Sequence, residues 1–124
     1  MTTARVNTPA VHLSGPMVTN LAVYRGDSGR FRITVADYNG TPVDISTATW
    51  DADIRKTADD PTVITSFTVT PVAGDPASVD VVLAADQSAL LDGNCVYDVQ
   101  MTLGAEVSTL IYGSITLTQD VSRA

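Results

Sequence analysis

Apolar and polar residues alternate with a period of two through most of this chain, in short runs separated by turn residues. In the run 30–35, Phe31, Ile33 and Val35 alternate with two arginines and a threonine, and a longer run covers 95–103. Successive side chains of a β-strand point to opposite faces, so each run predicts a strand with one buried and one polar face. Many such runs at short spacing predict an all-β sandwich or barrel, and we expect about seven or eight strands.

Turn-forming residues separate the expected strands. Asn39-Gly40 is the strongest two-residue hairpin signal, because both residues tolerate positive φ. The segment 84–91, AADQSALL, has good helix formers and ends before an Asp-Gly pair, so it predicts one short helical crossover. Gly113, inside the last expected strand, is a candidate β-bulge. The remaining expected turns cover residues 25–29, 71–77 and 104–106.

The length of 124 residues favours a single domain with its own hydrophobic core. Residues 1–19 are mostly polar and contain Pro9 and Pro16, so we expect an extended N-terminal arm that becomes ordered against a partner. The β-sandwich domain is expected to cover residues 20–124. The N-terminal stretch has one arginine and no apolar run of signal-peptide length, which favours synthesis in the cytoplasm over secretion.

The balance of charge argues against two classes of partner. Fourteen acidic and seven basic residues give a formal net charge of −7. Nucleic-acid-binding proteins need a basic face, and anionic membrane surfaces attract basic segments, so we expect neither nucleic acid nor membrane as a partner. Cys95 is the one cysteine, which precludes an intrachain disulfide. It lies in an alternating run and is expected to be a small buried side chain, not a reactive thiol.

No residue pattern predicts catalysis. His12 is the one histidine and lies in the expected arm, outside the strands that would hold a base beside a nucleophile. Asp51 and Asp53 share one face of an expected strand, where a carboxylate pair is one interpretation and a solvated strand face is the favoured one. We therefore expect a protein that is not an enzyme, with no catalytic residue and no cofactor.

Aspartates in loops leave one alternative open. Asp37-x-Asn39-Gly40 is similar to the start of a calcium-binding loop, but its glycine falls at the fourth position instead of the sixth, which favours a hairpin turn. We expect no metal site there. A weaker calcium site stays open among the loop aspartates Asp59, Asp60 and Asp75.

The stretch 24–31, YRGDSGRF, contains the tripeptide Arg25-Gly26-Asp27, which animal cell-adhesion receptors recognise. Gly26 offers positive φ and Asp27 can close its own turn, so the tripeptide is also an ordinary chain reversal. Its position between a Leu-Val run and a Phe-Ile-Val run favours the chain reversal. We expect these three residues to form a turn that contacts a neighbouring subunit.

Several segments are informative as an ordered set, although each alone is ordinary turn or strand chemistry. They are Leu21-x-Val23-Tyr24-Arg25-Gly26-Asp27, Asn39-Gly40-Thr41-Pro42-Val43-Asp44-Ile45-Ser46, Asp53-Ile54-Arg55-Lys56, the AADQSALL turn, Val96-Tyr97-Asp98-Val99-Gln100, Gly113-Ser114-Ile115-Thr116-Leu117 and Asp120-Val121-Ser122-Arg123. In this order they resemble the small Ig-like β-sandwich domains of tailed-phage virion proteins. The resemblance extends over residues 20–124, and it is greatest to the N-terminal domains of upper baseplate proteins and to small minor tail proteins.

The resemblance implies an Ig-like antiparallel β-sandwich and a structural role in a virion. It implies assembly into the tail tip or baseplate by protein–protein contacts, with a capsid decoration (head) protein as the alternative. The implied partners are other virion proteins, and the chain is expected to form a homo-oligomer, a ring or a trimer, in the particle. The implied location is the virion, after synthesis in the cytoplasm of a host bacterium. The alternative from a different functional class is a β-sandwich module that binds a sugar or a receptor.

Overall fold

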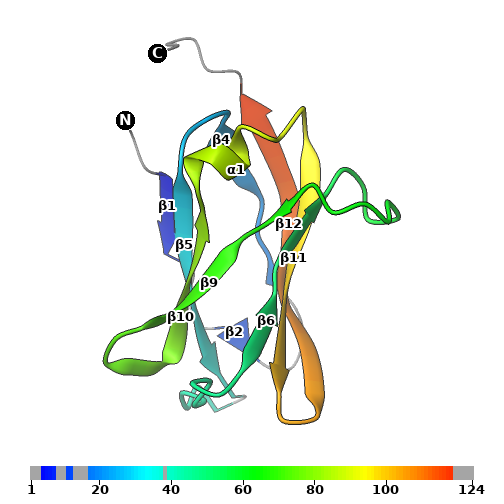
Figure 1. The fold of residues 1–124 in the computed structure, drawn as a ribbon. Helices are drawn as coiled ribbons and strands as arrows, with labels where there is room; N and C mark the ends of the chain where they lie inside the picture. The colour runs from blue at the N-terminus through cyan, green and yellow to red at the C-terminus, as the bar shows by residue number, and fades with distance from the viewer. Residues whose placement is uncertain (1–3, 8–10, 13–16, 38, 119–124) are drawn as a thin grey trace.

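Two β-sheets pack face to face and enclose the hydrophobic core (Figure 1). The structure is a computed structural model that describes residues 4–7, 11–12, 17–37 and 39–118, the first two segments as backbone alone. In the first sheet the order is β1-β5-β10-β9, and β2 also pairs with β5. These strands are β1 (Ala4–Asn7), β2 (Val11–His12), β5 (Gly29–Ala36), β9 (Thr68–Val72) and β10 (Asp75–Leu83).

The second sheet has the order β3-β12-β11-β7-β8, with β4 also paired to β12 and β6 also paired to β11. Its strands are β3 (Met17–Val18), β4 (Leu21–Tyr24), β6 (Thr49–Asp51), β7 (Asp53–Arg55), β8 (Thr65–Ser66), β11 (Cys95–Leu103) and β12 (Glu106–Thr118). The expected all-β sandwich is therefore confirmed. More strands form than the seven or eight expected, because expected strands divide, as β6 and β7 do on either side of Ala52.

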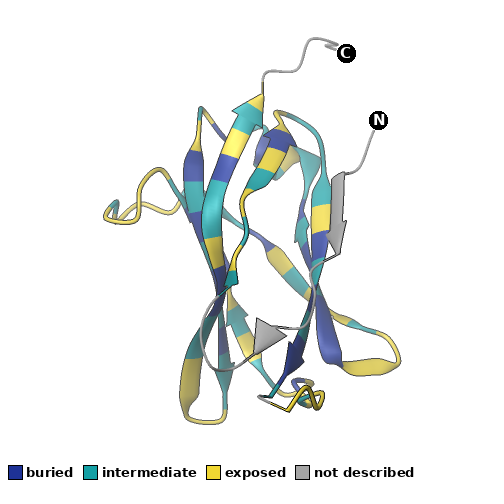
Figure 2. Ribbon diagram, turned by 180° about the vertical axis from the view of Figure 1, so that it is seen from behind, coloured by how far each residue is buried: buried dark blue, intermediate teal, exposed yellow. Residues whose placement is uncertain are grey.

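The core follows the alternation of the sequence. Phe31, Ile33 and Val35 on β5 are buried, and so is every second residue of β11 from Cys95 to Met101. Figure 2 shows this change between buried and exposed positions along the strands. The rings of Phe31, Phe67 and Tyr97 meet edge to face between the sheets, with centroids 5.5 to 6.2 Å apart. Such contacts favour one fixed arrangement of the rings.

The N-terminal segment adds parallel strands to both sheets. β1 and β2 run parallel to β5 in the first sheet, whereas β3 and β4 run parallel to β12 in the second. The other strand pairs are antiparallel. Part of the expected arm thus pairs with the sandwich of its own chain, and residues 1–3, 8–10 and 13–16 lie outside the described residues.

The bulge in the last strand lies at Leu110 and not at Gly113. Val99 pairs with Ile111 and Gln100 pairs with Thr109, so Leu110 is the extra residue. Leu110 and Ile111 are consecutive and both buried, whereas regular alternation would turn one of them toward the outer face of the sheet. A glycine is required at 113 for a different reason: a Cβ atom there would overlap the backbone of Thr19, where the N-terminal segment runs beside β12. Gly113 therefore permits a close backbone approach.

One short helix, α1 (Ala85–Ser88), connects β10 of the first sheet to β11 of the second, as the expected crossover. It lies at one end of the sandwich, beside the turn between β4 and β5 (Figure 1). It is shorter than the expected 84–91, because the amides of Leu90 and Leu91 bond three residues back instead of four. No helix in the described part of the chain is long and apolar enough to cross a membrane.

Candidate functional site

The Arg25-Gly26-Asp27 tripeptide forms the turn that leads from β4 in the second sheet to β5 in the first. The amide of Asp27 donates to the Tyr24 carbonyl at 3.0 Å and closes the turn. Gly26 has a φ of 91°, a conformation that suits glycine. The Arg25 amide donates to the carbonyl of Thr118 at 2.9 Å, which ties the turn to the end of β12. The predicted chain reversal is therefore present.

The hydroxyl of Ser88 holds this turn against α1. Its Oγ accepts the Gly26 amide hydrogen at 2.9 Å and lies 2.7 Å from the Asp27 carbonyl oxygen, to which it donates. It also lies 3.1 Å from the Ala85 carbonyl, so its single proton is shared between two acceptors. Ser88 has no exposed surface. A buried hydroxyl thus satisfies two backbone groups of the turn at once.

Arg25 adds a contact from its side chain. Its Nε donates to the Ala89 carbonyl at 3.2 Å, where the helical turn ends and carbonyl groups lack partners within the helix. Arg25 is exposed, whereas Gly26 and Asp27 are half-buried. The three residues therefore lie together at one end of the sandwich, with their backbone fixed by α1. Their expected contact with a neighbouring subunit stays a prediction.

Sequence patterns alone did not identify Ser88. It lies in a helix-like segment where the two leucines carry the apolar signal, and nothing local marks a serine as buried. Its partners are 61 and 62 residues away along the chain. A polar residue between Gln87 and Ala89 is compatible with a solvated helix surface, so only the tertiary structure shows its role.

Asp51 and Asp53 lie in the second sheet, on β6 and β7, which both pair with β11. Asp51 is exposed, while Asp53 accepts the Ser66 hydroxyl at 2.8 Å and pairs with the Arg55 guanidinium at 3.6 Å. Arg55 also donates to the Asp60 carbonyl at 2.9 Å. The same face carries Asp98, which no sequence pattern marks as a site residue. Burial, and then the charge of Asp53, raise the pKa of the Asp98 carboxyl.

The aspartates considered for calcium are engaged in their own turns. Asp37 Oδ1 accepts the amides of Asn39 and Thr41, each at 2.9 Å. The Asp37 amide donates to the Thr41 carbonyl, so this turn is longer than the expected two-residue hairpin. Asp60 accepts the amide of its neighbour Thr62. Within the described ranges, no three His, Cys, Asp or Glu side chains lie where they could hold a metal ion.

The remaining candidates lie apart from the turn. Cys95 is buried, and burial raises the pKa of its thiol, as expected for a small core residue. Tyr97 is buried as well; its hydroxyl donates to the Thr19 carbonyl at 2.6 Å, and burial raises its pKa. Asp75 accepts the Ala77 amide at 3.1 Å and the Ser78 hydroxyl at 2.7 Å. His12 belongs to β2, opposite Ala36, and its side chain lies outside the description.

Comparisons with known proteins show remote structural similarity alone. No protein-family model matches the chain, and no curated protein matches it. A cysteine protease inhibitor, EhICP2 from Entamoeba histolytica, has 11% identity and a TM-score of 0.49 over 94% of this chain and 97% of that one. A nucleoside hydrolase-related hypothetical protein from Saccharophagus degradans, associated with carbohydrate metabolism, has 10% identity and a TM-score of 0.29. That match covers 83% of this chain and 22% of the other.

Proposed function

We propose that this chain is a structural protein of a tailed-phage virion, which assembles into the tail tip or baseplate through protein–protein contacts. The observation that carries the proposal is the ordered set of segments between residues 20 and 124. In the fold, the segments up to residue 117 are β4 and the turn after it, the turn after β5, α1 and the strands β7, β11 and β12, and residues 120–123 lie outside the described residues. The set therefore describes one connected sandwich.

The environment of the Arg25-Gly26-Asp27 turn favours assembly over cell adhesion. An adhesion loop presents its arginine and aspartate side chains to a receptor. Here the Arg25 side chain donates to the Ala89 carbonyl, and Ser88 bonds the backbone of the other two residues. These contacts support a turn whose first role is to join the two sheets.

Exposed apolar side chains supply surface for protein–protein contacts. Leu90, Val107 and Tyr112 have exposed fractions of 59%, 66% and 45%. They lie after α1, near the start of β12 and in its middle, so they belong to different parts of the molecule. Several separate contact surfaces suit a subunit that meets both its own copies and other virion proteins in a ring or trimer.

Mass spectrometry of purified phage particles tests this proposal. Heads and tails are separated after disruption, and peptides of this chain are quantified in each fraction against a known tail protein. We expect them in the tail fraction at a fixed ratio. Recovery with heads alone would replace the tail-tip role with capsid decoration, and absence from both fractions would refute a virion role.

A separate measurement addresses the binding-module alternative. Asp27→Ala removes the carboxylate that an adhesion receptor needs and leaves the backbone contacts of the turn to Ser88 in place. We expect the folded variant and the wild type to bind cells and glycans equally weakly. Specific binding by the wild type that Asp27→Ala abolishes without unfolding would favour the receptor-binding module.

A further inference from the structure

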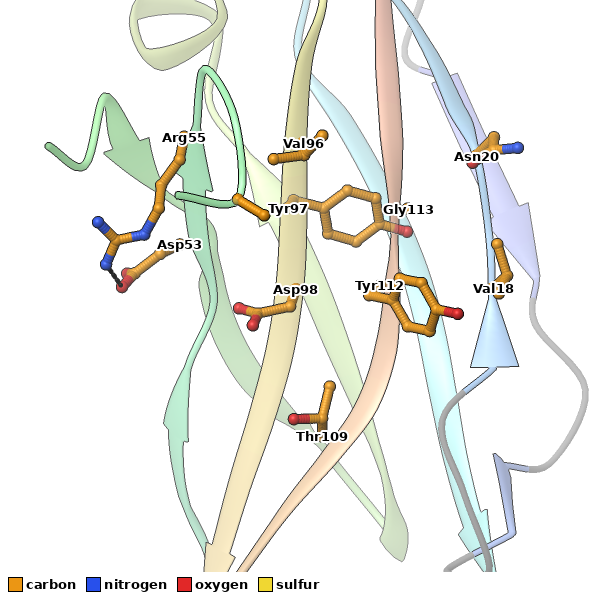
Figure 3. A pocket seen from close by; sticks show the side chains of 11 residues that line it. Val18, Asn20, Asp53, Arg55, Val96, Tyr97, Asp98, Thr109, Tyr112 and Gly113 are labelled. Carbon is orange, nitrogen blue, oxygen red and sulfur yellow. Dashed lines mark ion pairs between the residues drawn. The ribbon is translucent and has the colours of Figure 1, made fainter. Parts of the chain in front are cut away.

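A groove of about 520 Å³ lies on the outer face of the second sheet, where β7, β11 and β12 lie side by side. Val18 and Tyr112 line it toward the N-terminal edge, and Asp53 and Arg55 line it on the opposite side. Asp98 lies between these two groups (Figure 3). The groove is separate from the Arg25-Gly26-Asp27 turn, none of whose residues lines it.

One side of the groove is apolar and aromatic. Val18 and Tyr112 have exposed fractions of 56% and 45%, and Val96 beside them is half-buried. Tyr112 lies directly opposite Asp98 across the β11–β12 pair. Figure 3 shows the Tyr112 ring pointing toward Val18, and the Asp98 carboxylate pointing the other way, toward Asp53. An aromatic surface and a carboxylate therefore lie next to each other on neighbouring strands.

The Asp98 carboxylate is poorly compensated within the chain. It is half-buried, and no described residue donates a hydrogen bond to it or forms an ion pair with it. The Arg55 guanidinium, which lines the same groove, is bonded to the Asp53 carboxylate and to the Asp60 carbonyl. Burial raises the pKa of Asp98 most, the charges of Asp53 and Asp51 raise it further, and the charge of Arg55 opposes the rise only in part. A cation placed beside Asp98 would offset this unfavourable environment.

We propose that this groove binds a lysine or arginine side chain of a partner protein, with the cation at Asp98 and an adjacent apolar residue on Tyr112 and Val18. The charge of the groove suits a basic partner. Three carboxylates and one guanidinium lie on or beside this face, and the whole chain has a formal net charge of −7. That the partner is another virion protein rests on the proposed function, whereas the preference of the groove for a cation does not.

The dimensions of an extended segment fit this arrangement. Neighbouring strands lie about 4.8 Å apart, so the groove from β7 across β11 to β12 spans about 10 Å. Side chains two positions apart in an extended segment lie on one face about 7 Å from each other. A basic residue and an apolar residue at that spacing therefore reach Asp98 and Tyr112 together. An arginine also gains from contact with the face of an aromatic ring.

A peptide titration followed by amide chemical shifts tests the proposal. The probe is acetyl-Gly-Arg-Gly-Leu-Gly-amide, and its control carries citrulline, which has the shape of arginine without the charge. We expect the arginine peptide to shift the amides of Val96, Asp98 and Tyr112 at low ionic strength. We expect the citrulline peptide to bind about fivefold more weakly, the upper range for an exposed ion pair.

Two variants with the same loss of charge make the test specific. Asp98→Asn should weaken binding of the arginine peptide about fivefold. Asp86→Asn, which removes an exposed carboxylate on α1, should leave binding unchanged within about twofold. Equal binding of the two peptides, or equal effects of the two variants, would overturn the proposal. Because the titration uses the isolated protein, its result is independent of whether the chain is found in phage particles.

Discussion

Removal of the Ser88 hydroxyl tests how the turn is held. In Ser88→Ala, the Gly26 amide loses its acceptor and the Asp27 carbonyl loses its donor, while no side-chain volume beyond one oxygen is lost. An unsatisfied buried polar group costs about 1–3 kcal/mol. Because Gly26 and Asp27 are half-buried, water can replace part of each bond. We therefore expect a loss of about 2 kcal/mol in the free energy of unfolding, at the low end for two groups.

Thermal unfolding followed by circular dichroism measures this loss. For a domain of this size, about 2 kcal/mol lowers the midpoint by roughly 8 °C. The matched control is Ser108→Ala, which removes a half-buried hydroxyl on β12 with no side-chain hydrogen bond among the described residues. We expect the control to melt within about 2 °C of the wild type. A Ser88→Ala protein that melts with the control would refute the role of the hydroxyl.

Three further substitutions test other contacts. Gly113→Ala should lower the free energy of unfolding by about 2 kcal/mol in urea titrations, because the added methyl group overlaps the backbone of Thr19; an unchanged midpoint would contradict the close approach. Tyr97→Phe should cost about 1 kcal/mol by the same measurement through loss of its bond to Thr19, and a cost near zero would show that water replaces this bond. Asp98→Asn should raise the free energy of unfolding at pH 7. Folding raises the pKa of the Asp98 carboxyl, so the ionised carboxylate destabilises the folded protein once the pH is above that pKa, and asparagine carries no such charge. The gain should shrink as the pH falls through the raised pKa and vanish below the ordinary aspartate pKa, and a gain that is independent of pH would exclude titration as its cause.

The parts of the fold that depend on local alternation were predictable from sequence. On β5 and β11 most buried residues follow a polar one, as Phe31 and Val99 do, and their burial agrees with that pattern. The turn at Gly26 was predictable too, because glycine at a chain reversal between two apolar runs has a direct conformational reason. These features depend on residues that are close along the chain.

Features that depend on strand pairing were not predictable. The bulge at Leu110 follows from the register between β11 and β12, and Gly113 looked like the better bulge residue by composition. The requirement for Gly113 arises from Thr19, which is remote in the sequence. Strands β1, β2 and β3 of the N-terminal segment have only two to four residues each, too few for a periodic pattern to appear. Strand β4 was predictable from the alternation of Leu21 and Val23.

The candidate site was predictable only in part, because some of its contacts also depend on residues that are remote in the sequence. The tripeptide was identified by its own letters, but Ser88, which holds it, became visible only once α1 was placed beside the turn. The groove at Asp98 and Tyr112 likewise needs the register of β11 and β12, because it joins residues from three strands and the N-terminal segment. Long-range register is a property of the whole chain and has no local signal.

Immunogold electron microscopy of intact particles tests the proposed virion role most directly. A phage that encodes this chain with a short epitope tag is purified away from cell lysate and labelled with an antibody against the tag. The proposal predicts gold at the tail tip in a fixed position on most particles. Particles without gold, from a lysate in which the same antibody detects the soluble protein, would contradict a structural role in the virion.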